Sequence, residues 1–178
     1  MTQASDVSAT KRSLHRTYHC FDASALVKLV RDEPQSEEVR AYAQTHSPIH
    51  ATQFSLYEAL SVLKRLWQKG HTEHQDYLDC CWSLVGFVNR GSLLLAAGPD
   101  SSVMNAALQL VDAERIDLSD ALQIVSIEHS YFWTGTRLEA NTLCSFAAVL
   151  VTADRKLAKV TERRHLRTWL IGTPVVES

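Results

Sequence analysis

Four acidic residues stand where the sequence could build a binding site for divalent cations. Asp22 and Asp154 each end a short apolar run and precede a helical pattern, whereas Glu58 and Asp120 lie inside helical patterns. Clustered carboxylates repel one another, so they must take up protons or bind cations. A set with oxygen ligands and no Cys or His favours Mg²⁺ or Mn²⁺ over zinc. Such ions orient phosphates and activate water, which is the chemistry of phosphodiester hydrolysis.

Four further residues adjoin these acids in the sequence. The hydroxyl groups of Ser24 and Thr152 could orient the ligands or a metal-bound water. Asp117 precedes Leu-Ser-Asp120, and this acid-x-x-acid spacing resembles a capping box, so we favour a helix cap over a metal ligand for Asp117. Arg155 could contact a phosphate, but we favour a solvated helix arginine.

Each of the four acids also has a purely structural interpretation. Asp22 and Asp154 could simply cap the helices that follow them. Asp120 is in the first turn of its helix, where the helix dipole favours a negative charge. Glu58 could be an ordinary exposed helix residue. The case for a metal site therefore rests on the conjunction of the four residues.

The elements that must position these acids are indicated by the apolar patterns. The sequence predicts strands over 17–22, 49–51, 92–98, 147–154 and 167–172. It predicts helices over 23–33, 34–46, 52–69, 73–89, 99–114, 116–130 and 155–164. Apolar strands separated by helices are typical of a parallel sheet covered on both faces. We expect an α/β fold of about five strands in three layers, α/β/α. Ligands of such sheets bind beyond the carboxyl ends of the strands, where Asp22 and Asp154 are expected.

The helix predicted over 52–69 has the clearest pattern in the chain. Leu56, Leu60 and Leu63 recur at helical spacing, and Gly70 follows the last turn. The segment 73–89 is its expected antiparallel partner, and Trp67 and Trp82 are expected to pack the two helices together. Residues 131–146 carry no clear pattern, and either a loop or an extension of the preceding helix would fit them.

The bulk composition sets limits on the class of protein. The 178 residues fit one domain, expected over 17–178 after a polar extension over 1–16. No apolar run is long enough to span a membrane, and the N-terminus has no apolar signal core, so we expect a cytoplasmic protein. The formal net charge of −2 argues against passive DNA binding. It is compatible with a nuclease, because bound cations restore positive charge locally.

At these residues the chain resembles the PIN-domain nucleases, particularly the VapC-like toxins of type II toxin–antitoxin modules. The resemblance spans about residues 18 to 173 and is carried by FDASALVKL, TQFSLYEALSVL, LSDALQI and LVTADRKLAK, in this order. It implies a PIN-like (Rossmann-like) sheet, usually ordered 3-2-1-4-5. It carries the family's acids over to Asp22, Glu58, Asp120 and Asp154, and its hydroxyl positions to Ser24 and Thr152.

The resemblance also implies an activity and partners. These are a single-strand endoribonuclease that uses one or two Mg²⁺ or Mn²⁺ ions, a homodimer, and a cognate antitoxin that inhibits the toxin. Two alternatives stay open. One is a PIN-domain ribonuclease of RNA maturation or turnover without an antitoxin, and the other is a non-catalytic interaction module. The N-terminal extension and the segment 131–146 depart from a minimal member, but neither removes an acid.

Overall fold

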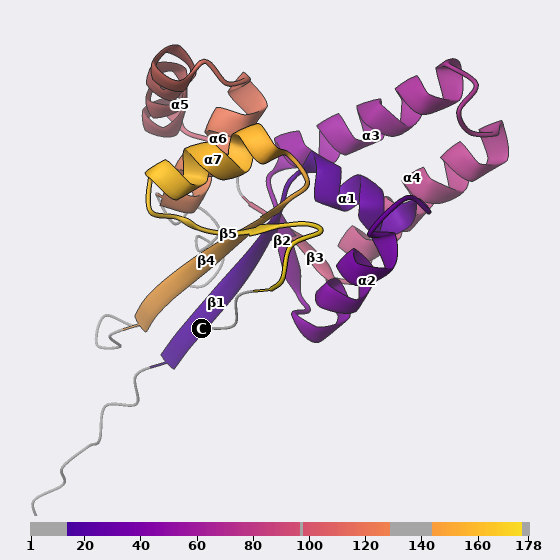
Figure 1. The fold of residues 1–178 in the computed structure, drawn as a ribbon, viewed down its shortest axis with the longest axis horizontal. Coiled ribbons are helices and arrows are strands. Elements are labelled where there is room, and N and C mark those ends of the chain that lie inside the picture. The colour runs from indigo at the N-terminus through magenta and orange to yellow at the C-terminus, as the bar shows by residue number, and fades with distance from the viewer. Residues whose placement is uncertain (1–13, 97, 129–143, 176–178) are drawn as a thin grey trace, which may run out of the picture.

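The computed structural model describes residues 14–96, 98–128 and 144–175, which form a five-stranded sheet flanked by helices (Figure 1). The strands are β1 (Leu14–Phe21), β2 (Ile49–Ala51), β3 (Leu93–Leu95), β4 (Cys144–Thr152) and β5 (Arg167–Leu170). The helices are α1 (Ala23–Val30), α2 (Ser36–Thr45), α3 (Gln53–Gln68), α4 (His74–Asn89), α5 (Ser101–Glu114), α6 (Leu118–Glu128) and α7 (Arg155–Arg163). The predicted order of strands and helices along the chain is confirmed.

All pairs of neighbouring strands are parallel, and their order is β3-β2-β1-β4-β5. The central strand β1 pairs with β4 along its whole length, from Leu14 opposite Cys144 to Phe21 opposite Val151. The carboxyl ends of β1 and β4 therefore lie side by side. The two residues after Phe21 and Val151, Asp22 and Thr152, begin the rim of the sheet where ligands are expected.

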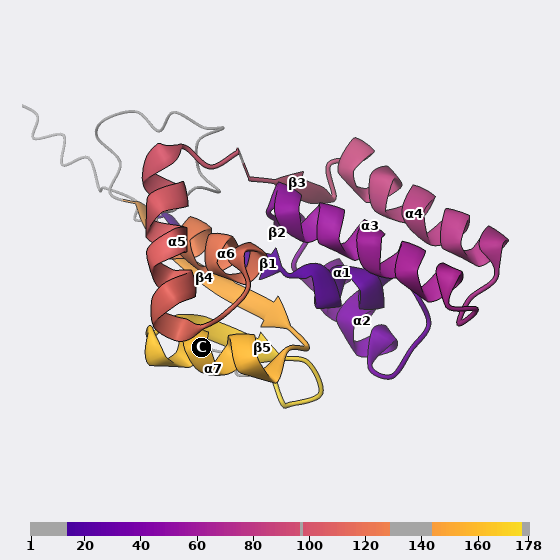
Figure 2. The same ribbon diagram turned by 90° about the horizontal axis from the view of Figure 1, so that it is seen from above.

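Helices cover both faces of the sheet, and each face has its own apolar core (Figure 2). Helices α1 to α4 cover one face, where Phe21 and Val151 are buried. Helices α5 to α7 cover the other, where Cys20 and Leu150 are buried. Because successive strand residues point to opposite faces, β1 and β4 contribute alternate side chains to the two cores. The predicted three-layer α/β/α architecture is confirmed.

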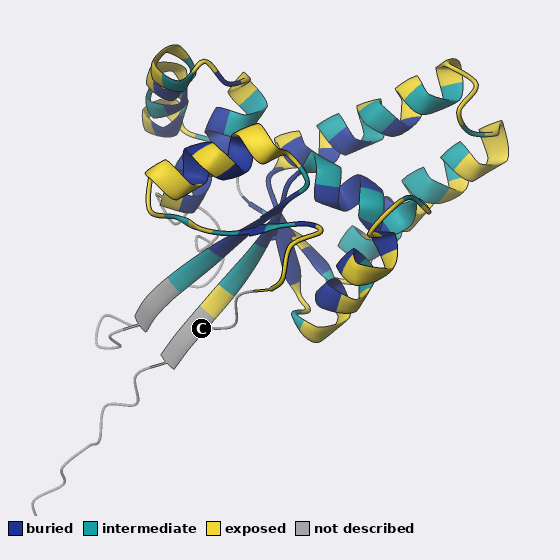
Figure 3. Cartoon of the chain, viewed as in Figure 1, coloured by how far each residue is buried: buried dark blue, intermediate teal, exposed yellow. Residues whose placement is uncertain are grey.

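Helices α3 and α4 form an antiparallel hairpin that extends beyond the sheet, and the end farthest from the sheet is exposed (Figure 3). Gly70 follows α3 with a φ of +72°, a conformation that favours glycine. Trp67 stacks on Tyr77 of α4, with ring centroids 5.2 Å apart. The expectation that Trp82 also packs this hairpin is wrong, because Trp82 is 69% exposed.

The boundaries of several strands differ from the sequence prediction. Strands β1 and β4 each begin three residues earlier than expected, and β3 is only three residues long. Pairing between main chains extends β1 and β4 beyond their apolar runs, since ladder hydrogen bonds do not depend on the side chains. Strand β4 ends at Thr152, so Asp154 lies two residues beyond the strand and not within it.

Two of the segments named in the sequence analysis lie largely outside the described residues. These are residues 1–13 of the N-terminal extension and residues 131–143 of the segment 131–146. The domain boundary at residue 17 stays a prediction, although β1 already begins at Leu14. Among the described residues, no helix is long and apolar enough to cross a membrane.

Candidate active site

The four predicted acids line one cleft of about 410 Å³ beyond the carboxyl ends of β1 and β4. Asp22 precedes α1, Glu58 belongs to α3, Asp120 to α6, and Asp154 precedes α7. The helices come from both layers, so the cleft joins the two sides of the sheet. The gathering of the four acids at one rim of the sheet is what the sequence pattern predicted.

Asp22 is buried, and its carboxylate is held by three hydrogen-bond donors. The Ala25 main-chain N–H donates to Oδ1 at 2.8 Å, so that Asp22 caps α1. The Ser24 hydroxyl donates to the same oxygen at 2.7 Å, and the Thr152 hydroxyl donates to Oδ2 at 2.5 Å. The structural interpretation of Asp22 as a cap is therefore confirmed, and the same carboxylate also lines the cleft.

The two hydroxyl residues join the loop after β1 to the loop after β4. Ser24 Oγ accepts a hydrogen bond from the Ala153 main-chain N–H at 2.8 Å. Thr152 Oγ1 accepts one from the Asp154 main-chain N–H at 2.9 Å while it donates to Asp22. Each hydroxyl therefore fixes the Asp22 carboxylate and the loop that carries Asp154.

Asp154 is exposed and caps α7. Its Oδ1 accepts hydrogen bonds from the main-chain N–H groups of Lys156 and Leu157, at 2.6 and 3.1 Å. Both bonds end on Oδ1, which leaves Oδ2 out of the cap. A capping carboxylate that uses one oxygen can still offer the other to a ligand in the cleft.

The pKa values of two of the acids, Asp22 and Asp120, are raised, in both cases mainly by burial. Burial raises the pKa of Asp22 to about 6, against the opposing effect of its hydrogen bonds. Burial, followed by repulsion from Glu58 and Asp154, raises the pKa of Asp120 to about 7. Near neutral pH these groups are close to taking up protons, and a cation would relieve the same repulsion.

The donor set of the cleft fits a hard divalent cation, because it offers carboxylate and hydroxyl oxygens. As the side chains are placed, no three Asp, Glu, His or Cys residues among the described residues are close enough together to hold one ion. Bringing the carboxylates onto a common ion would therefore need side-chain rotation. The flanking hydrogen bonds fix Asp22 most firmly, and no described hydrogen bond holds the carboxylates of Glu58 or Asp120.

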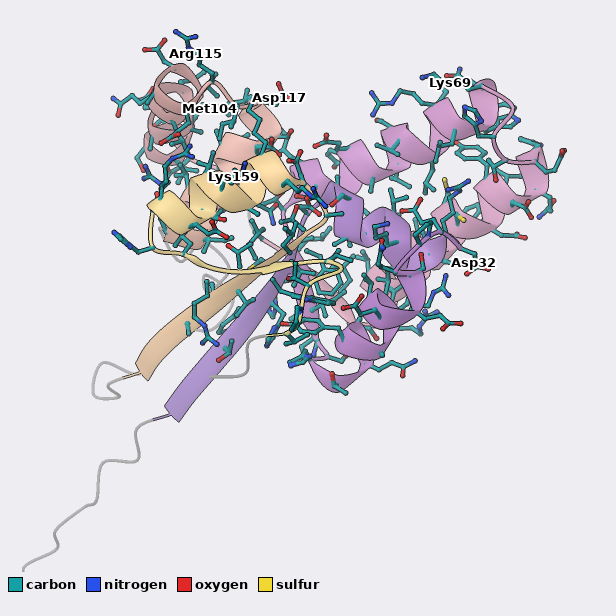
Figure 4. All side chains as sticks on the ribbon, in the orientation of Figure 1. Asp32, Lys69, Met104, Arg115, Asp117 and Lys159 are labelled. Atoms are coloured by element: carbon teal, nitrogen blue, oxygen red, sulfur yellow. The ribbon has the colours of Figure 1, made fainter. Side chains whose placement is uncertain are left out.

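Of the two secondary candidates, Asp117 lines the cleft and Arg155 does not. Asp117 lines the cleft where the chain enters α6 (Figure 4). Its main-chain carbonyl accepts from the Ala121 N–H at 3.0 Å, but no described hydrogen bond joins its carboxylate to the helix, so its capping role stays a prediction. Arg155 is exposed at the start of α7 and is not among the residues that line the cleft.

Sequence reasoning missed several polar residues that line the cleft, among them Lys28 and Gln123. Lys28 on α1 brings a positive charge, and its Nζ lies 3.0 Å from the carboxylate of Glu33. Gln123 on α6 is 1% exposed and lies one turn after Asp120. The available signal for Gln123 was a single amide within the apolar run Ala121–Ile127, at the spacing that puts it on the same helix face as Asp120.

The parallel sheet in the order 3-2-1-4-5, with an acid-lined cleft at its rim, defines a PIN-like α/β/α domain. No family model matches the chain, and no curated protein matches it. Among solved structures, VapC20 of Mycobacterium tuberculosis, a sarcin-ricin loop cleaving toxin, matches 80% of this chain and 94% of its own. The TM-score is 0.56 and the sequence identity 10%.

A second similar structure is PAE2754 from Pyrobaculum aerophilum. It covers 82% of this chain and 86% of its own, with a TM-score of 0.54 and 19% identity. At these identities the likeness concerns the fold. The resemblance to VapC-like PIN domains noted in the sequence is therefore confirmed for the fold of this chain.

Proposed function

We propose that this protein is a metal-dependent endoribonuclease that cleaves single-stranded RNA and acts as the toxin of a type II toxin–antitoxin module. The observation that carries the proposal is the convergence of Asp22, Glu58, Asp120 and Asp154, from four separate segments, on one cleft of a PIN-like fold. The match to VapC20, a toxin that cleaves the sarcin-ricin loop, supports RNA as the substrate class.

In this proposal the four acids hold one or two Mg²⁺ or Mn²⁺ ions. When bound, these ions supply a Lewis acid for the phosphate and a water of lowered pKa. Asp22 is the fixed member of the set, because Ser24 and Thr152 hold both of its oxygens. Glu58 and Asp120 approach from helices on opposite faces of the sheet.

Lys28 supports a phosphate-containing substrate. Its ammonium group lines the same cleft and is the basic side chain among the lining residues. Glu33 and the carbonyl of Pro34 hold it in place, at 3.0 and 2.8 Å. A cation fixed at the edge of an acidic cleft can bind a phosphate next to the scissile one and so orient the strand.

The activity is tested with purified protein and a labelled single-stranded RNA. We expect cleavage with Mg²⁺ or Mn²⁺, none in EDTA, and loss of cleavage in Asp22→Asn. Asparagine is as good a helix cap as aspartate, so this variant keeps α1 while it removes the charge. The matched control is Asp112→Asn, an exposed residue of α5 outside the cleft. Cleavage that survives Asp22→Asn or EDTA would falsify the proposed site.

The toxin assignment needs a separate test, because a ribonuclease of RNA maturation or turnover would pass the cleavage assay. Induced expression of the wild type should arrest growth, Asp22→Asn should not, and co-expression of a small protein encoded beside the gene should restore growth. Sequencing of RNA ends after induction would identify the cut site. Cleavage without growth arrest would favour maturation or turnover.

We also propose that the protein forms a homodimer and resides in the cytoplasm. The dimer can be measured in solution. Light scattering on the eluting protein gives the mass in solution, and twice the 20.0 kDa of the chain is expected. A monomeric mass over the whole concentration range of the cleavage assay would exclude the dimer as the active form.

A further inference from the structure

The Gln123 side chain is buried between α6 and the start of α3, and its two polar atoms have different surroundings. Gln123 Oε1 accepts hydrogen bonds from the hydroxyls of Ser55 and Thr52, the second at 3.3 Å. The Thr52 hydroxyl also caps α3, since it accepts from the Ser55 main-chain N–H at 2.9 Å. These contacts fix the amide, with its oxygen directed at the start of α3.

The amide nitrogen, on the other side, is buried. Within the described part of the chain, Gln123 Nε2 makes no hydrogen bond. A buried donor left unpaired costs about 1–3 kcal/mol, so such groups are rare and call for an explanation. Gln123 lines the acid cleft, which offers acceptors.

Asp120 is the acceptor that the helix geometry favours. Residues three apart on a helix are neighbours on its surface, so Asp120 and Gln123 lie one turn apart on α6. No described hydrogen bond holds the Asp120 carboxylate in its present position. Glu58 is one turn beyond Ser55 on α3, the helix that already occupies the oxygen side of the amide.

We propose that Gln123 is a positioning residue, whose Nε2 donates a hydrogen bond to the Asp120 carboxylate when that carboxylate turns to bind a divalent cation in the cleft. The inference rests on the cation of the proposed function. A carboxylate that binds a cation through one oxygen has its second oxygen available for such a donor. Removing a hydrogen-bonding partner of a metal ligand typically lowers metal affinity about 10–100-fold.

The test measures Mn²⁺ binding by calorimetry, in the absence of RNA. Gln123→Met keeps the length of the side chain and removes the donor, and we expect Mn²⁺ affinity to fall about 10–100-fold. Thr161→Val is the matched control, because it removes a buried hydroxyl from α7, outside the cleft. We expect it to change Mn²⁺ affinity less than threefold, even where it lowers the unfolding temperature more than Gln123→Met does.

A double variant separates positioning of Asp120 from an independent effect. If Gln123 acts through Asp120, Gln123→Met combined with Asp120→Asn binds Mn²⁺ no more weakly than Asp120→Asn alone. Additive losses would overturn the proposal, and so would unchanged affinity in Gln123→Met. Wild-type protein that binds Mn²⁺ but cleaves no RNA would refute the ribonuclease and leave this inference standing. Wild-type protein that binds no Mn²⁺ would refute both.

A measurement on the wild-type chain does not depend on how the variants fold. Adding diamagnetic Mg²⁺ should move the Gln123 side-chain amide proton resonance downfield and slow its exchange with solvent, because the proton enters a hydrogen bond to a carboxylate. The Gln53 side-chain amide, on an exposed residue at the start of α3, provides the internal control. A Gln123 resonance that stays unchanged at saturating Mg²⁺ would contradict the proposal.

Discussion

Replacing Asp120 by asparagine should stabilise the metal-free protein at alkaline pH. The Asp120 pKa is raised from 3.8 to about 7, mainly by burial and then by Glu58. When the pKa of a carboxyl group is higher in the folded state than in the unfolded state, protonation of that group stabilises the folded state. The folded protein therefore loses stability as pH rises from 3.8, where the unfolded chain ionises, to about 7. Asparagine cannot ionise and avoids this loss.

The magnitude follows from the difference between the two pKa values. A change from 3.8 to about 7 corresponds to about 4 kcal/mol for a fully buried group. The Asp120 side chain is partly exposed, and solvent screening reduces the expected gain to about 1–2 kcal/mol. For a chain of this size, that raises the unfolding temperature by about 2–8 °C.

The assay is urea or thermal unfolding in EDTA at pH 8 and at pH 4, with Asp112→Asn as the control on an exposed site. We expect Asp120→Asn to exceed the wild type at pH 8 and to match it near pH 4. Added Mg²⁺ at pH 8 should then raise the stability of the wild type more than that of the variant. The reasoning is refuted if the variant gains nothing at pH 8, or if its gain is the same at both pH values.

Three further predictions concern residues around or behind the cleft. Thr152→Val removes a hydrogen bond to the buried Asp22 carboxylate, so it should cost about 1.5–3 kcal/mol in urea unfolding at pH 8, and an unchanged midpoint would contradict this. Burial lowers the pKa of His50 to about 4, so its contribution to stability is complete above pH 6.5 and is lost as pH falls toward 4. In His50→Gln the free energy of unfolding should therefore fall less than in the wild type between pH 6.5 and pH 4, whereas Asp120→Asn changes the alkaline side of the same pH series. A steeper fall in His50→Gln would count against this prediction. Burial also raises the pKa of the Cys20 thiol, so iodoacetamide should label Cys20 only after unfolding, and rapid labelling of the native protein would exclude a buried thiol.

The sequence predicted the rim of the sheet well because local patterns determine it. Apolar strands that end in Asp22 and near Asp154 can be recognised without knowing what they pair with. The α3 pattern placed Glu58 correctly for the same reason. The starts of β1 and β4 were not predictable, since both strands are lengthened there by pairing between residues about 130 positions apart.

Gln123 was missed for a related physical reason. Within α6 it looks like a core position, and its importance follows from the contact of α6 with Thr52 and Ser55 of another helix. Hydrogen bonds between distant segments leave no periodic pattern. The choice of Asp22 as a cap could be predicted, whereas the hydroxyl of Thr152 on its second oxygen depends on the register of β1 and β4.

The pairing of β1 with β4 has a consequence for the order of events during protein synthesis. The central strand is made among the first residues described here, but one of its two edges must wait for residues 144–152. Asp22 receives its hydrogen bond from Thr152, and the cleft receives Asp154, only after those residues leave the ribosome. A nascent chain therefore carries three of the four acids without a finished cleft until residues 144–154 have been translated.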